Sequence, residues 1–129
     1  LRNHSDKDVL VLMATGTGIA PLKSILSSAR NRDKLKAFRR VILLWGMRRQ
    51  SDIFWAPELN EVEFIPVLSR ETSEKRYVQD RLVGLGIDFS SAVIYACGAD
   101  EMIQQAREIA LSKHLAPDSF YSDAFVASN

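Results

Sequence analysis

The chain has 129 residues with 17 basic and 16 acidic side chains, so its formal net charge is only +1. This length fits one domain, and the balanced charge gives no overall case for nucleic acid or an anionic membrane as partner. The longest apolar runs are far shorter than the ~20 residues of a membrane-spanning helix. A single cysteine, Cys97, excludes an internal disulfide and a multi-cysteine metal site, and we expect a cytoplasmic protein without a bound metal.

The first half of the chain alternates between apolar runs and helical patterns. Residues 8–13 (DVLVLM) and 40–45 (RVILLW) are rich in valine, isoleucine and leucine, which is typical of parallel strands buried on both faces. Residues 19–30 repeat apolar side chains at helical spacing, and Pro21 falls in the first turn, where a missing N–H is harmless. Residues 51–59 predict a short helix.

The second half repeats this alternation. Residues 63–68 (EFIPVL) and 92–96 (AVIYA) predict two further buried strands. Residues 77–85 and 100–113 each place apolar side chains on one face and predict helices. Residues 120–125 (FYSDAF) predict a fifth, less apolar strand nearer an edge of the sheet.

Strand followed by helix, four times over, predicts an open parallel sheet with helices on both faces. Right-handed crossovers then restrict the possible topologies to a handful. We therefore expect one doubly wound α/β domain over residues 1–129, with five strands in the order 3-2-1-4-5.

The loop after the first predicted strand has the composition of a phosphate-binding loop. Residues 14–21 read ATGTGIAP and lead directly into a helix. Glycines let the backbone approach a pyrophosphate, and the helix N-terminus offers free N–H groups and a partial positive charge. Pro21 replaces the third glycine of the usual dinucleotide fingerprint, so a tight turn without a ligand is the alternative interpretation.

Glycine, hydroxyl and arginine side chains gather where the predicted strands end. Besides the first loop, residues 46–49 (GMRR), 69–70 (SR) and 97–100 (CGAD) follow strands. Ligands of open parallel sheets bind at these carboxyl ends, so the pattern favours a nucleotide site. The acidic residue that usually holds an adenosine ribose is missing, and Arg48 and Arg49 stand in its place. A solvated pair of surface arginines is the alternative for these two.

Several of these segments resemble the signatures of the nicotinamide domain of the ferredoxin–NADP reductase family. Residues 14–22 (ATGTGIAPL) resemble the first signature and residues 95–98 (YACG) the second. Residues 67–70 and 77–80 occupy the intermediate positions, and residues 120–126 resemble the C-terminal strand. The SDAF ending is similar to that of iron–sulfur flavoprotein reductases that serve oxygenases or deoxysugar dehydratases, such as the CDP-6-deoxy-glucoseen reductases.

The resemblance implies a role for each matching position. The backbone of the first loop would hold the pyrophosphate, and Cys97 and Gly98 would lie beside the nicotinamide ring. We assign Cys97 as the catalytic position, acting as a positioning group and not as a nucleophile; a small buried residue at a strand end is the alternative. Phe125 would cover the flavin or simply pack in the core. The expected cofactor-binding residues are Thr15, Gly16, Thr17, Gly18, Pro21, Arg48, Ser69, Arg70, Lys75, Tyr77, Gln79, Cys97, Gly98, Asp100, Met102 and Phe125.

The choice between NADPH and NADH depends on the segment from residue 69 to residue 79. It resembles the Ser-Arg and Lys-x-Tyr-x-Gln arrangement of NADP-dependent members, in which basic side chains pair with the 2′-phosphate and a tyrosine, here Tyr77, stacks on the adenine. Ser-Arg also occurs in relatives that use NADH, and Glu71 and Glu74 dilute the local positive charge. We favour NADPH slightly and leave NADH open.

The family resemblance also implies the reaction. A hydride passes from NAD(P)H to FAD, and electrons continue to an iron–sulfur or haem partner. The FAD would be held mainly by a β-barrel domain of the same polypeptide, and neither its Arg-x-Tyr-Ser motif nor the cysteines of an iron–sulfur module are in this sequence. We therefore expect a domain that is not active by itself.

Two other classes of function stay open. One is a stand-alone nucleotide-binding or interaction module without redox activity. The other is a different doubly wound enzyme, although the Tyr-x-x-x-Lys pair of short-chain dehydrogenases is absent and the first loop only partly imitates that of a flavodoxin.

Overall fold

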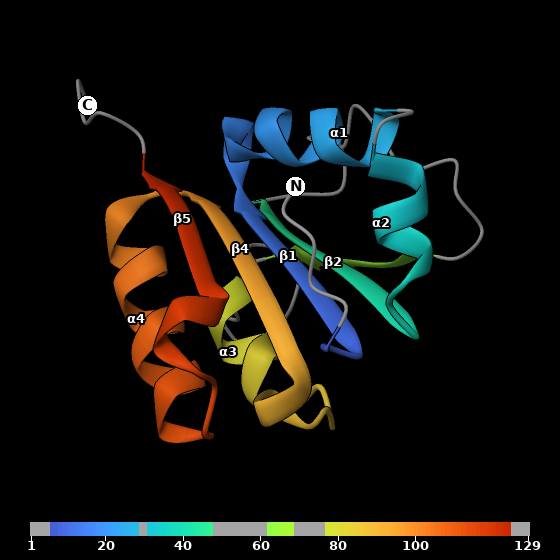
Figure 1. Ribbon diagram of the computed structural model, residues 1–129. Helices are drawn as coiled ribbons and strands as arrows, with labels where there is room; N and C mark the ends of the chain where they lie inside the picture. The colour runs from blue at the N-terminus through green and yellow to red at the C-terminus, as the bar shows by residue number, and fades with distance from the viewer. Residues whose placement is uncertain (1–5, 29–30, 48–61, 69–76, 125–129) are drawn as a thin grey trace.

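A five-stranded parallel sheet forms the centre of the computed structural model, which describes residues 6–28, 31–47, 62–68 and 77–124 (Figure 1). The strands follow the order β3-β2-β1-β4-β5, and every neighbouring pair is parallel. This confirms the predicted fold class and strand order. The strands are β1 (Val9–Thr15), β2 (Arg40–Met47), β3 (Val62–Leu68), β4 (Ala92–Gly98) and β5 (Phe120–Ala124).

Helices cover both faces of this sheet (Figure 1). The helices α1 (Ile19–Ser27) and α2 (Arg32–Lys36) pack on one face, and α3 (Val78–Val83) and α4 (Asp100–Ser112) pack on the other. None of the helices among the described residues is long and apolar enough to cross a membrane. Three short 3-10 helices complete the described structure: η1 (Gly16–Gly18), η4 (Phe89–Ser91) and η5 (Pro117–Ser119).

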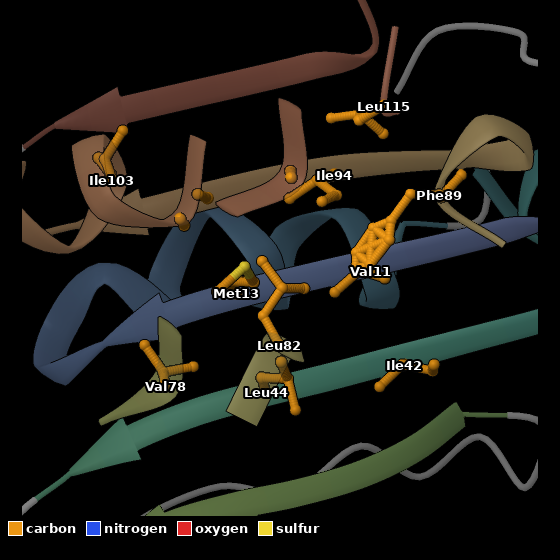
Figure 2. Close-up of a cluster of buried hydrophobic side chains, with 14 of the residues drawn as sticks. Val11, Met13, Ile42, Leu44, Val78, Leu82, Phe89, Ile94, Ile103 and Leu115 are labelled. Carbon is orange, nitrogen blue, oxygen red and sulfur yellow. The ribbon is translucent and has the colours of Figure 1, made fainter. Parts of the chain in front are cut away.

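The central strand β1 supplies both halves of the core. Successive side chains of a strand point to opposite faces, so Val11 and Met13 pack toward α3 and α4 whereas Leu10 and Leu12 pack toward α1 and α2. All four are fully buried, and each contributes about 1.5–3 kcal/mol relative to an exposed side chain. Figure 2 shows the half of the core beneath α3 and α4.

The predicted helix over 19–30 is shorter in the structure, and a helix that we did not predict follows it. The first helix ends at Ser27, and Ser28 is already extended. The side-chain amide of Asn31 donates a hydrogen bond to the carbonyl of Ile25 (3.3 Å), one of the carbonyls in the last turn of the helix that lack an intrahelical donor. The missed helix, α2, has only five residues, which is too short to show a helical period.

The other boundaries differ by one or two residues. The helix predicted over 77–85 spans Val78–Val83, and that predicted over 100–113 ends at Ser112. The strands β1, β2 and β4 each extend two residues beyond the apolar run that predicted them, because parallel pairing continues into the mostly small residues at their carboxyl ends. The helix predicted over 51–59 lies outside the described residues.

Candidate functional site

The loops that follow β1 and β4 pack directly against each other. The parallel register pairs Ala14 with Cys97, so Gly16–Gly18 and the turn after β4 emerge side by side at the carboxyl edge of the sheet. A Cβ atom on Gly18 would overlap the carbonyl oxygen of Cys97 and lie 2.9 Å from the Cα of Gly98. Glycine at position 18 is therefore required by the close approach of the two backbones.

A hydrogen bond of Thr15 also connects these two loops. Its Oγ1 accepts a hydrogen bond from the backbone N–H of Ala99 at 3.0 Å. Gly98 has φ +142°, and a Cβ at that position would overlap Thr15 Oγ1. Only glycine combines this backbone conformation with this contact.

Trp45 forms a hydrogen bond to the first loop. Its indole Nε1–H donates to the carbonyl oxygen of Gly16 at 3.0 Å, and its side chain is almost fully buried at the end of β2. Its burial follows from its place in an apolar strand, but its bond to the loop was not predicted. The available signal was a tryptophan, which needs a partner for its N–H, at the carboxyl end of a strand.

The first loop leaves open space beside the start of α1. Gly16 has φ +51°, and a Cβ there would meet no atom within 4 Å. The helix α1 begins after Gly18 with no side-chain cap and no acidic residue in its first turn, and Pro21 occupies its third position. The N-terminus of α4, by contrast, carries Asp100 and Glu101 in its own first turn. An anionic ligand therefore interacts more favourably with α1 than with α4.

Cys97 lies at the end of β4 as a buried, free thiol. Burial raises the pKa of the Cys97 thiol to about 11, and the negative charge of Asp123, its paired residue on β5, acts in the same direction. The side chain is therefore an uncharged thiol at neutral pH. Because the thiolate is the nucleophilic form, this supports a positioning role rather than attack on a substrate.

Tyr77 and Gln79 lie at the start of α3 in different environments. Tyr77 is 50% exposed. Gln79 is buried; its Nε2 donates to Gln105 Oε1 at 2.8 Å, and Gln105 Nε2 donates to Glu101 Oε1 at 3.3 Å. The Oε1 atom of Gln79 has no hydrogen-bond partner among the described residues. A buried unpaired acceptor costs about 1–3 kcal/mol, so a donor from a ligand would be stabilising there.

The structure brings together only part of the predicted set. Thr15, Gly16, Thr17, Gly18, Cys97, Gly98 and Asp100 meet at the ends of β1 and β4, where the strand order reverses and open α/β sheets bind ligands. Met102 packs in the core beneath α4, where its helical spacing places it, and its contact with a cofactor stays a prediction. Five predicted residues lie outside the described part of the chain: Arg48, Ser69, Arg70, Lys75 and Phe125.

Curated relatives match nearly the whole chain. Protein RfbI of Salmonella typhimurium is 34% identical, and the match covers 98% of this chain and 40% of the relative. The CDP-6-deoxy-L-threo-D-glycero-4-hexulose-3-dehydrase reductase of Yersinia pestis is 32% identical, with 97% and 40% covered. The chain thus spans about 40% of the length of these relatives.

Solved structures share the fold. The ferredoxin–NADP reductase of Neisseria gonorrhoeae with bound FAD and NADP has a TM-score of 0.77 at 21% identity, and the match covers 94% of this chain and 57% of that one. The cytochrome P450 reductase GcoB of Amycolatopsis has a TM-score of 0.75 at 25% identity, with 92% and 38% covered. The profile of the oxidoreductase NAD-binding domain matches residues 12–108, well over half of the sequence. Together these matches confirm the predicted relation to ferredoxin–NADP reductases, and the chain belongs to the oxidoreductase NAD-binding domain family.

Proposed function

We propose that this chain binds NAD(P)H at the carboxyl edge of β1 and β4, as one domain of a larger flavoprotein reductase. The observation that carries the proposal is the open space above Gly16 beside the uncapped start of α1. A phosphate group could approach the backbone there, and the positive end of the α1 dipole would stabilise its negative charge. The backbone of residues 15–18 would hold the pyrophosphate.

The residues around Cys97 fit the nicotinamide end of such a ligand. When bound, the nicotinamide supplies a hydride for a flavin. The protein contributes position: Thr15 holds the turn after β4 through Ala99 N–H, directly after Cys97 and Gly98 at the end of that strand. An uncharged thiol beside the nicotinamide ring would favour neither the positively charged oxidised ring nor the neutral reduced ring.

The larger protein would hold FAD mainly in another domain and pass electrons to an iron–sulfur or haem partner. The relatives support this proposal, since they are reductases named for a dehydrase and for a cytochrome P450. We propose a cytoplasmic location and no nucleic acid or membrane partner, in keeping with the nearly balanced charge. The preference for NADPH, through Arg70 and Lys75, remains a proposal that titration decides.

Calorimetric titration with NADPH, NADH, 2′,5′-ADP and 5′-AMP tests the proposed site. Gly16→Ala places a methyl group in the open space and should weaken nucleotide binding at least tenfold. Gly86→Ala is a matched control, because Gly86 has a similar positive φ of +66° and equally free surroundings, in the loop after α3. Equal effects of the two substitutions on binding, or no binding by the wild-type protein, would contradict the proposal. Tighter binding of 2′,5′-ADP than of 5′-AMP would assign NADPH.

A further inference from the structure

A cavity lies at the edge of the sheet opposite the proposed nucleotide site. It has a volume of about 470 Å³ and lies where α2 leads into β2 and where β3 begins. The eight residues of β2 separate this edge from the carboxyl edge by roughly 25 Å, at about 3.3 Å per residue. A ligand in this cavity therefore cannot touch the loops around Gly16 and Cys97.

Apolar side chains form the inner wall of the cavity. Leu35, Phe38 and Val41 belong to the core half beneath α1 and α2, and Val62 at the start of β3 packs against them. A volume between about 300 and 1,000 Å³ with a mainly apolar lining is typical of small-molecule sites. The wall thus suits the apolar body of a ligand.

Three basic side chains surround the opening. Arg32, Lys36 and Arg39 line the cavity and are exposed, and among the residues that the structure describes no acidic side chain lines it with them. Within the described part of the chain none of the three forms an ion pair, whereas the adjacent Arg40 makes a two-bond ion pair with Glu63 at 2.8 and 2.9 Å. Arg32 and Lys36 stand four residues apart on one helix face, where like charges repel. An anion at the opening would relieve that repulsion.

We propose that this cavity binds a small amphipathic carboxylate, with its aromatic or medium-chain aliphatic body against the apolar wall and its carboxylate at the basic opening. The mainly apolar lining favours the apolar body, and the three cations, which form no ion pair with the other described residues, favour the negative charge. Arginine offers paired donors that match a carboxylate. The site is separate from the proposed nucleotide site.

Titration of the isotope-labelled protein with 2-naphthoate, followed by NMR, tests this site. We expect saturable shifts at the amides of Leu35, Val41 and Val62, and at least tenfold weaker binding of the neutral analogue 2-naphthalenemethanol. Binding of the carboxylate should weaken as salt is added, because the cations are exposed to solvent. Shifts confined to the Gly16 and Cys97 loops, or an absence of saturable shifts, would overturn the proposal.

Charge variants separate this site from general attraction to a basic surface. Lys36→Gln and Arg39→Gln should each weaken 2-naphthoate binding threefold or more. Arg107→Gln removes the same charge from α4, on the other face of the sheet, and should leave binding unchanged. Equal effects of all three variants would overturn the proposal. Nucleotide titration of the same variants is an independent readout, so failure here is distinguishable from failure of the proposed function.

Discussion

The substitution Gly18→Ala isolates the contact between the two loops of the site. Gly18 has φ −60° and ψ −9°, a conformation that alanine adopts without strain. On backbone grounds alone, the substitution would stabilise the protein by about 0.4–1 kcal/mol, because it restricts the unfolded chain. Any loss of stability must therefore come from the added methyl group.

The structure gives the size of that steric penalty. The new Cβ would overlap the carbonyl oxygen of Cys97 and lie 2.7 Å from its carbonyl carbon and 2.9 Å from the Cα of Gly98. These are backbone atoms held by the β1–β4 pairing and by the bond from Ala99 N–H to Thr15, so they cannot rotate away. Overpacking of this kind costs about 1–3 kcal/mol. We expect a net loss of about 1–2 kcal/mol once the backbone gain is subtracted.

Urea unfolding measures this loss as a change in the free energy of unfolding. In thermal unfolding the same loss corresponds to a decrease in Tm of roughly 3–5 °C per kcal/mol for a chain of this length. Gly84→Ala is the matched control. Gly84 also has a negative φ, and its new Cβ would meet only ordinary contacts at 3.6 Å and beyond. If Gly18→Ala proved as stable as Gly84→Ala, the assignment of Gly18 to backbone packing would be refuted.

Three further predictions concern the same edge of the sheet. Thr15→Val removes the acceptor of Ala99 N–H and should lower the free energy of unfolding, measured in urea, by about 0.5–1.5 kcal/mol. Thr15→Ser keeps the hydroxyl and should retain most of the wild-type stability. Equal losses in the two variants would contradict the role of the hydroxyl. Trp45→Phe removes the donor to Gly16 and should weaken nucleotide binding by calorimetry more than Phe64→Leu, a change to the ring that neighbours Trp45; the reverse order would argue against the loop anchor. Folding raises the pKa of Cys97 from 9.0 to about 11, so the unfolded thiol ionises first and the contribution of Cys97 to stability should be lost as pH rises from 9 to 11. A Cys97→Ala variant should lack this part of the decline, and identical pH profiles would show that Cys97 does not contribute.

The sequence alone determined the layers of the fold and indicated the edge of the sheet at which we propose the nucleotide site. The runs that became β1, β2 and β4 are apolar because both faces of those strands are buried, and this composition is visible without any partner strand. The glycine-rich loop of residues 14–21 stood out for a similar reason, since its backbone requirements are local.

Only the tertiary structure decided how the loops fit together. Gly18 meets Cys97 across 79 positions of sequence, and Trp45 reaches Gly16 across 29, so these contacts depend on strand register and helix position rather than on any local pattern. The sequence predicted that Met102 lies on an apolar helix face and also that it binds the cofactor. The structure confirms the first prediction, because Met102 packs in the core beneath α4. The short helix α2 and the cavity beside it were also absent from the prediction, because five residues carry no period and a cavity arises only where separate elements meet.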